Sequence, residues 1–314
     1  MLVALTGATG FVGSHTVQSL IDAGHQVRAL IRPGRGAGWL EGLGVEVCRG
    51  ALGDETALCA LVASVDAVVH TAYDSAVWDA QDQLPHLRSN VLGSLMLLEL
   101  ARQAGVRQFI CTVSTYLLRR DVEGPGDVRE APLDETAPWV ASWMPYVTHN
   151  VILESASQAY GAQFGMATTR FRCAWIYGVH PQAEKSVWRS LLEDVRAGRV
   201  CDNAFGCDVV AVQDVAAALT ASVGRPAAFG QVFNLCDMFV YQTDLARLAG
   251  EAVGIPAKVS RGDLPRPGPI RSEKVRALGL DVHRGPDGIR AYFGELDRAL
   301  KGQGHRRVLC GKIL

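Results

Sequence analysis

Three glycines after the first apolar run constrain the fold of this chain more than any other feature. They have the spacing GxxGxxG (Gly7, Gly10 and Gly13) and join a predicted strand, Leu2–Thr6, to a predicted helix, Gly10–Ala23. The first glycine permits a tight turn, the second leaves room for a ligand beside the backbone, and the third lets helix and strand pack closely. A strand, a glycine turn and a helix in this order predict the first βα unit of a parallel sheet.

Strands and helices go on alternating through the first half of the chain. Strands such as Ala67–His70 are continuously apolar, which is typical of strands covered by helices on both faces. Hydrophobic periodicity predicts further strands over residues 26–31, 108–113, 168–172 and 231–235, and helices over 55–64, 87–104, 146–163, 188–197, 243–253 and 272–278. The pattern predicts an α/β fold with a doubly wound parallel sheet, the Rossmann fold.

The chain is long enough for this sheet and for a second, smaller lobe. Its 314 residues exceed the roughly 150 residues of an average domain. We expect residues 1–170 to form the Rossmann domain, with residues 208–236 returning to it. Residues 171–207 and 237–314 are expected to form a smaller C-terminal lobe.

Charge and cysteine content exclude several classes of function. The chain has 31 Lys and Arg against 32 Asp and Glu, a net charge of −1, so no positive field attracts it to nucleic acid or to an acidic membrane. Its eight cysteines form no CxxC pair, which argues against a disulfide framework and a zinc site. No basic region precedes the first apolar run, and no stretch reaches the roughly 18 apolar residues of a membrane span. We expect a cytoplasmic protein that binds a small molecule and no metal, nucleic acid or membrane.

The glycine turn also has the form of a phosphate site. Backbone N–H groups at the start of a helix carry partial positive charge, and a pyrophosphate reaches them only where side chains are absent. A fold specific for NAD places a carboxylate at the end of the second strand, but this position holds Ile31, followed by Arg32 and, nearby, Arg35. Because a guanidinium pairs with a 2′-phosphate that a carboxylate would repel, we predict NADP(H) as the preferred cofactor, with NAD(H) as the alternative.

Landmark segments follow one another in a fixed order along the chain. They are the glycine turn and residues 65–72, 90–101, 112–114, 132–136, 172–178, 212–216, 230–235 and 271–279. In this order they resemble the extended branch of the short-chain dehydrogenase/reductase family, which comprises NAD(P)-dependent epimerases, dehydratases and reductases. One departure is Ala51, where the family usually has an Asp that contacts adenine. The resemblance implies an oxidoreductase that transfers a hydride between nicotinamide and a carbonyl or alcohol carbon, with the substrate held by the smaller C-terminal lobe.

The resemblance also implies roles for individual residues. Ser114 is expected to hold the substrate oxygen, and Tyr146 to exchange a proton with it. The substrate is further expected to contact Tyr177 and His70, because ligands gather at the carboxyl ends of parallel strands. The cofactor is expected to contact Gly7, Thr9, Gly10, Phe11, Val12, Gly13, Arg32, Arg35, Leu52, Thr71, Ala72, Tyr73, Asn90, Tyr146 and Asn150.

The chain departs from the family four residues after Tyr146. The family has a catalytic lysine there, whereas this chain has Asn150, on the same helix face as Tyr146 and beside His149. An amide can replace the lysine in part as a hydrogen-bond partner of the cofactor ribose. It cannot stabilise a tyrosinate: a cation ~4 Å away at an effective dielectric of ~20 contributes ~4 kcal/mol, or up to ~3 pKa units.

Three interpretations of this departure stay open. In the first, which we adopt, the enzyme still transfers hydride, and reduction suffers less than oxidation because a neutral phenol is already an acid. In the second, the chain is a catalytically degenerate NADP(H)-binding sensor or regulator. In the third, His149 or a substrate group is the acid or base. The family often dimerises through the two helices that include residues 87–104 and 146–163, so the resemblance also implies a homodimer.

Overall fold

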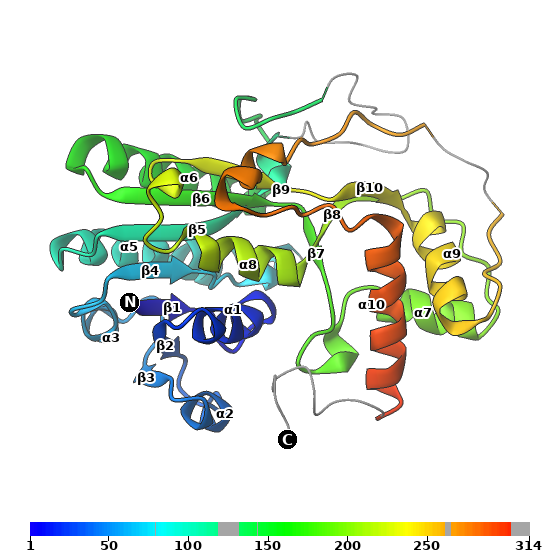
Figure 1. Ribbon diagram of the computed structural model, residues 1–314, viewed down its shortest axis with the longest axis horizontal. Helices are drawn as coiled ribbons and strands as arrows, with labels where there is room; N and C mark the ends of the chain where they lie inside the picture. Colours follow the sequence, from blue (N-terminus) through cyan, green and yellow to red (C-terminus); the bar gives the residue numbers. More distant parts are fainter. Residues whose placement is uncertain (79, 119–131, 143, 261–264, 303–314) are drawn as a thin grey trace.

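The computed structural model describes residues 1–78, 80–118, 132–142, 144–260 and 265–302, and its larger part is a seven-stranded sheet (Figure 1). All neighbouring strands of this sheet pair in parallel, in the order β3-β2-β1-β4-β5-β6-β9. The strands are β1 (Leu2–Thr6), β2 (Gln26–Ile31), β3 (Glu46–Arg49), β4 (Ala67–His70), β5 (Gln108–Ser114), β6 (Ala167–Cys173) and β9 (Val232–Leu235). The strand order runs outward from β1 in both directions, so the predicted doubly wound α/β fold is confirmed.

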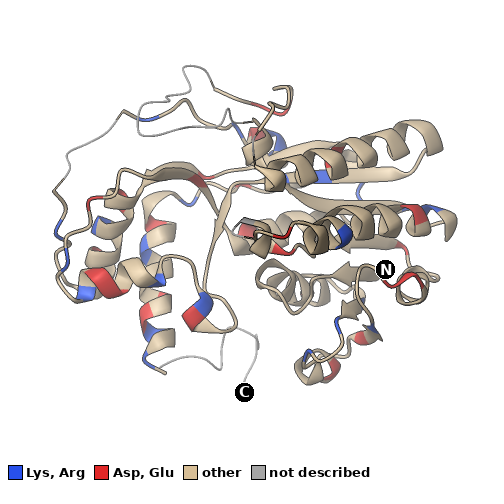
Figure 2. Cartoon of the chain, turned by 180° about the vertical axis from the view of Figure 1, so that it is seen from behind, with Lys and Arg blue, Asp and Glu red and all other residues tan. Residues whose placement is uncertain are grey.

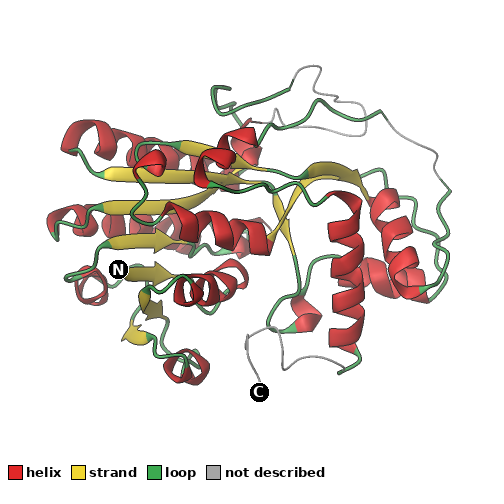
Figure 3. Ribbon diagram, in the orientation of Figure 1, coloured by secondary structure: helices red, strands yellow, loops and turns green. Residues whose placement is uncertain are grey.

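Alternate residues of each strand face helix layers on opposite sides of the sheet (Figure 3). On β1, Val3 and Leu5 join one apolar core and Ala4 joins the other. The first layer holds α1 (Phe11–Asp22), α8 (Val212–Ser222) and the short α2 (Gly38–Gly42); the second holds α3 (Glu55–Val62), α5 (Ser94–Gln103) and α6 (Pro145–Phe164). Coverage of both faces explains why these strands are continuously apolar.

A three-stranded sheet forms the centre of a second lobe. In it, β8 (Gly206–Ala211) pairs in parallel with β7 (Trp175–Tyr177) and antiparallel with β10 (Met238–Tyr241). Three helices pack around this sheet and share a separate apolar core with it: α7 (Arg189–Arg196), α9 (Gln242–Val253) and α10 (Gly285–Leu300). Of residues 208–236, most of β8 therefore pairs in the smaller sheet, whereas α8 and β9 belong to the larger part. Charged side chains of both signs are spread over both lobes (Figure 2).

Several elements were not predicted from the sequence. β3 is a half-exposed edge strand of four residues without an apolar run, and β7, although apolar, has only three residues. α10 begins with Gly285-Pro286-Asp287-Gly288, a sequence that is typical of a turn. The predicted helix over 272–278 is a 3₁₀ helix, Glu273–Leu278. No helix within the described ranges is both long and apolar enough to cross a membrane.

The predicted helix over residues 87–104 is interrupted near its start. It begins as α4 (Leu84–His86), continues as a π-helical segment, Leu87–Gly93, and becomes regular only in α5. A Cβ on Gly93 would lie 2.7 Å from the Cβ of Leu52, so the missing side chain lets this segment pack directly on the loop after β3. The wider turn aims the polar side chains of residues 88–90 toward the strand ends.

A buried histidine joins β1, β4 and α5. The Nδ1 atom of His70, the last residue of β4, lies 2.7 Å from Oγ1 of Thr6, and its Nε2 atom lies 2.9 Å from Oγ of Ser94. All three side chains are buried. Burial lowers the pKa of His70 to about 4, so the imidazole is neutral at physiological pH.

We predict that His70 makes the protein less stable as the pH decreases. The unfolded chain has a histidine pKa of about 6.5, so between pH 6.5 and 4 it binds more protons than the folded chain, and the free energy of unfolding decreases as pH falls. From pH 7.5 to pH 5 the loss due to His70 is about 2 kcal/mol. Urea unfolding of the wild type and of His70→Gln at both pH values measures it. The wild-type advantage should shrink by about 2 kcal/mol at pH 5; an unchanged advantage would contradict a buried neutral imidazole.

Candidate active site

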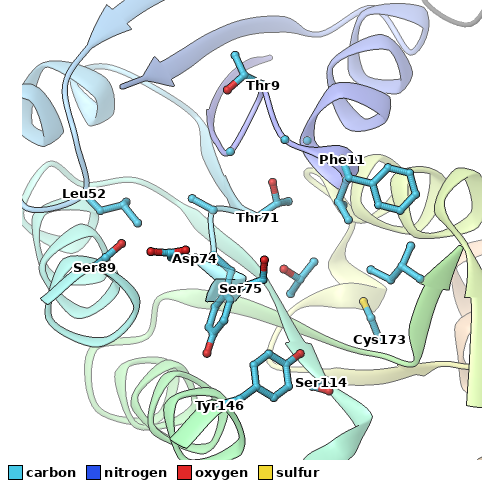
Figure 4. A pocket seen from close by; sticks show the side chains of 18 of the residues that line it. Thr9, Phe11, Leu52, Thr71, Asp74, Ser75, Ser89, Ser114, Tyr146 and Cys173 are labelled. Atoms are coloured by element: carbon cyan, nitrogen blue, oxygen red, sulfur yellow. The ribbon is translucent and has the colours of Figure 1, made fainter. Parts of the chain in front are cut away.

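A cavity of about 960 Å³ runs along the carboxyl ends of the parallel strands, between the sheet and the second lobe (Figure 4). Its walls come from the loops after the strands of the large sheet, from α6 and from the segment that follows β6. This is the edge at which open α/β sheets bind ligands. Most of the residues predicted from the sequence line it: Gly7, Thr9, Gly10, Phe11, Val12, Gly13, Arg32, Arg35, Leu52, Thr71, Ala72, Tyr73, Ser114, Tyr146 and Asn150.

The glycine turn packs too closely against its surroundings to carry side chains. Gly7 has φ +79°, and a Cβ there would lie 2.8 Å from the backbone nitrogen of Ala72 in the loop after β4. A Cβ on Gly13 would lie 2.1 Å from the carbonyl oxygen of Gly7. Gly10 caps the N-terminus of α1, which opens into the cavity. Backbone N–H groups without intervening side chains form a cradle that fits the anionic pyrophosphate of a dinucleotide.

The end of the cavity next to β2 carries positive charge. Arg32 and Arg35 are exposed side chains that line it, and neither pairs with a carboxylate of the described residues. Arg28, on the same strand, is occupied elsewhere: its Nε lies 2.9 Å from Oε1 of Glu46. The cations among the described lining residues are Arg32, Arg35, Arg88 and Lys185, and the carboxylate is that of Asp74. The cavity therefore favours an anionic ligand.

At the other end, Tyr146 of α6 faces Ser114 at the end of β5 (Figure 4). The Tyr146 ring lies between those of Tyr73 and Tyr116, with centroid distances of 5.3 and 6.4 Å and nearly perpendicular planes. Burial raises the pKa of Tyr146, and a hydrogen bond with the Ser114 side chain opposes part of that rise. Ser114 is itself oriented, because its Oγ accepts a hydrogen bond of 3.1 Å from the backbone N–H of Tyr116. Such a pair can hold a carbonyl oxygen and protonate it.

The side chain at the position of the family's lysine is turned toward its own helix. Asn150 is buried, and its Nδ2 donates a hydrogen bond of 2.8 Å to the backbone oxygen of Tyr146. Its amide also hydrogen bonds with the Tyr146 side chain, which lowers the pKa of the phenol only in part. The four lining cations named above all come from other elements than α6. The phenol of Tyr146 is therefore buried beside a neutral group and stays protonated at physiological pH.

His149, a hypothetical acid or base, is not among the residues that line the cavity. It is buried behind Tyr73, and its Nδ1 lies 3.3 Å from the phenolic oxygen of Tyr73. Burial lowers the pKa of His149, and the nearby His86 lowers it further. His86 in turn lies 3.1 Å from the carboxylate of Asp74. His149 thus supports the ring that packs against Tyr146.

Three predicted contacts, His70, Asn90 and Tyr177, are not among the lining residues. His70 belongs to the strand and points into the core. The Asn90 side chain holds the loop after β4, with hydrogen bonds to both the backbone nitrogen (2.8 Å) and oxygen (3.0 Å) of Asp74. Tyr177 packs on Trp188 in the core of the second lobe, at a centroid distance of 5.8 Å.

Sequence reasoning also missed lining residues. After Cys173 the wall continues through Ala174, Trp175 and Ile176. Trp175 and Ile176 of β7 both reach the cavity, whereas the adjacent Tyr177 packs in the core of the second lobe. One signal in the sequence could have indicated them. They follow the end of β6, the strand next to β5, and the end of β5 carries the predicted substrate contact Ser114.

The model of a protein family described as the NAD dependent epimerase/dehydratase family matches residues 3–236 of the chain. This span includes the glycine turn and the Ser114–Tyr146 pair. The chain belongs to this family, which confirms the resemblance to NAD(P)-dependent epimerases and dehydratases inferred from the sequence.

Curated relatives match part of the chain. It is 30% identical over 203 residues to the 2-alkyl-3-oxoalkanoate reductase of Stenotrophomonas maltophilia (64% of this chain, 57% of that protein). It is 30% identical over 210 residues to the dTDP-glucose 4,6-dehydratase of Mycobacterium tuberculosis (63% and 60%). The chain thus spans at most about three-fifths of the length of these relatives. Among solved structures, the UDP-glucose 4-epimerase of Thermus thermophilus in complex with NAD is 25% identical, with a TM-score of 0.77 and coverage of 95% of this chain and 100% of that one.

We predict that the glycine turn tolerates no side chain at its third glycine. In Gly13→Ala, the Cβ would meet a backbone oxygen, which no rotamer change relieves, so we expect a loss of about 3 kcal/mol in the free energy of unfolding. Gly36→Ala is the matched control, because a Cβ there has open space around it. Urea unfolding compares the two variants with the wild type. Equal stability of the two variants would contradict the close packing of the turn.

Proposed function

We propose that the protein is an NAD(P)-dependent oxidoreductase of the extended short-chain dehydrogenase/reductase type, which reduces a carbonyl group of a small molecule and prefers NADP(H). The observation that carries this proposal is the single cavity that joins the glycine cradle, the unpaired arginines and the Ser114–Tyr146 pair. Membership of the NAD dependent epimerase/dehydratase family supports it, as does the 30% identity to a reductase.

The lining residues fit a nicotinamide dinucleotide along the sheet edge. The pyrophosphate would be held by the turn from Gly7 to Gly13, with Thr9, Phe11 and Val12. The adenosine end would lie by Leu52, with Arg32 and Arg35 on a 2′-phosphate, and the loop Thr71–Tyr73 would line the middle. Tyr146 and Asn150 would contact the nicotinamide ribose. The bound cofactor supplies the hydride that the carbonyl carbon accepts.

The protein's own contribution to the chemistry is orientation and a proton. The Ser114 hydroxyl donates a hydrogen bond to the carbonyl oxygen and fixes its position. Tyr146 gives its phenolic proton to that oxygen as the carbonyl becomes an alcohol, and the tyrosinate then recovers a proton from water. Burial raises the pKa of Tyr146, and the neutral Asn150 does not stabilise its anion as a lysine would, so the residue is an acid ready for reduction. For the oxidation of an alcohol, which needs the tyrosinate as a base, Tyr146 is poorly suited, because little of it is ionised.

One observation favours a second function. Asn150 is neutral and its amide is bonded to the helix backbone, so position 150 does not supply the cation that the resemblance implies beside Tyr146. A protein that binds NADP(H) and responds to it without turnover would tolerate this loss. Consumption of NADPH with any carbonyl substrate separates the enzyme from such a sensor.

We predict that Arg32 and Arg35 select NADPH over NADH. A hydrogen bond to a charged group contributes about 1.5–3 kcal/mol, so Arg32→Ala and Arg35→Ala should raise the dissociation constant of NADPH by roughly 10- to 150-fold and leave that of NADH unchanged. Arg298→Ala, an exposed arginine of α10 far along the chain from the site, is the matched control. Nicotinamide fluorescence titrations measure both constants. Tighter binding of NADH than of NADPH by the wild type would overturn the preference.

We also predict that Asn150→Lys accelerates the oxidation of an alcohol. A lysine about 4 Å from the phenol would lower the pKa of Tyr146 by up to ~3 units, and alcohol oxidation near neutral pH should accelerate by at least about tenfold. Carbonyl reduction should change much less, because it needs the protonated phenol. Tyr146→Phe is the control and should lose both reactions. The pH profiles of kcat in both directions test this; an oxidation profile identical in wild type and Asn150→Lys would contradict it.

A further inference from the structure

The two ends of the cavity differ in chemistry, and the sheet order defines them. Strands β1 and β4 separate β2 from β5. Arg32 and Arg35 follow β2, whereas Ser114 ends β5 and Cys173 ends the next strand, β6. Figure 4 shows the same order, with Leu52 on one side of the cavity, Cys173 on the opposite side and Thr71 between them. Arg32 and Arg35 therefore lie at the adenosine end, at a distance of three strands from the reacting pair; the other two lining cations, Arg88 of the π-helical segment and Lys185 of the second lobe, come from outside the large sheet.

The wall around the reacting pair is aromatic and aliphatic. It consists of Tyr73, Tyr116, Cys173, Ala174, Trp175 and Ile176, and we call this set the aromatic wall. Burial raises the pKa of Tyr73 and of Cys173, so these two members stay neutral. No Lys, Arg, Asp or Glu belongs to it.

The aromatic wall continues to the surface of the protein. Trp175 is 36% exposed, and its ring meets that of Phe205, which is 49% exposed, at a centroid distance of 6.1 Å and an angle of 72°. Phe205 precedes β8, and Val209 of β8 pairs with Trp175. Trp175 lines the cavity and Phe205 contacts Trp175, so an apolar surface extends from the cavity to water.

The second lobe offers little to a diphosphate beside the reacting pair. Lys185 is its cation among the described lining residues, and it follows His180, whose ring stacks on Phe11 at 5.8 Å. Residues 180–185 therefore adjoin the glycine turn. Arg284 is held in the bidentate ion pair with Asp214, with both distances at 2.6 Å.

From these features we infer that the substrate is an apolar ketone or aldehyde whose hydrocarbon body lies along the aromatic wall to Trp175 and Phe205, and that it is not a nucleotide sugar. The inference rests on the proposed function and names the substrate class of the same site. The carbonyl oxygen would lie at Ser114 and Tyr146, and the polar end of the molecule is the carbonyl itself.

Binding of a homologous series of methyl ketones tests this without relying on turnover. Calorimetric titrations with 2-butanone to 2-octanone, with and without saturating NADP⁺, measure the affinities, and UDP-glucose is the charged comparison. Each methylene that the wall removes from water should tighten binding about fourfold, so 2-octanone, with four more methylenes, should bind roughly 250-fold more tightly than 2-butanone. UDP-glucose should bind more weakly than 2-octanone.

Substitutions test whether the aromatic wall causes the dependence of affinity on chain length. Trp175→Ala should weaken 2-octanone binding about tenfold or more and 2-butanone binding less than about threefold. Phe205→Ser, at a phenylalanine that contacts the lining residue Trp175, should weaken binding of the longest ketones. Phe229→Ser, at an exposed phenylalanine between α8 and β9, should not.

Two outcomes overturn the inference: affinity that does not depend on chain length, or UDP-glucose that binds more tightly than 2-octanone. Either result stands whether or not NADPH is consumed. Failure to bind NADPH, or binding without turnover on ketones that bind, would instead overturn the proposed function and leave the ketone affinities to decide the substrate class.

Discussion

The site depends on the contact between the glycine turn and the loop after β4. Gly7 can lie against Ala72 because it has no side chain and readily adopts a positive φ. The Thr71 hydroxyl adds to this contact by donating a hydrogen bond of 2.8 Å to the carbonyl oxygen of Thr6. This contact brings the start of α1 and the Thr71–Asp74 loop to the same edge of the sheet. Everything else in the cavity is placed relative to these two segments.

The reacting end is built on burial and ring packing and lacks a fixed charge. Tyr146 is held between two perpendicular tyrosine rings, and one of them, Tyr73, is fixed from behind by His149. Position 150, where the resemblance implies a lysine, holds an amide whose Nδ2 is hydrogen bonded to the helix backbone. The same absence of charge continues along the aromatic wall. A neutral acid and an apolar wall are mutually consistent features of a site for reducing apolar carbonyl compounds.

Most of the residues predicted from the sequence line the cavity. The glycine turn and Arg32 could be found because they directly follow strands of one parallel sheet, and Ser114 and Tyr146 because of the family resemblance. His70 could not be placed, because the last residue of a strand points to the core or to the ligand according to which neighbours fill the space, here Thr6 and Ser94.

The second lobe was harder to predict. Its sheet begins with a strand of three residues, too short for a periodic pattern, so the sequence did not show that Trp175 and Ile176 line the cavity whereas Tyr177 lies in the core. Trp175 and Phe205 meet only through the pairing of β7 with β8, a contact between segments about 30 residues apart that no local pattern encodes.

The most direct test of the account follows the hydrogen itself. The protein is incubated with NADPH deuterated at C4 and with 2-octanone, and the alcohol is isolated and examined by mass spectrometry. The account predicts 2-octanol with one deuterium at the carbinol carbon, formed by the wild type and not by Tyr146→Phe. Absence of labelled alcohol from the wild type, under conditions where calorimetry shows both ligands bound, would contradict the claim that this cavity reduces carbonyl compounds.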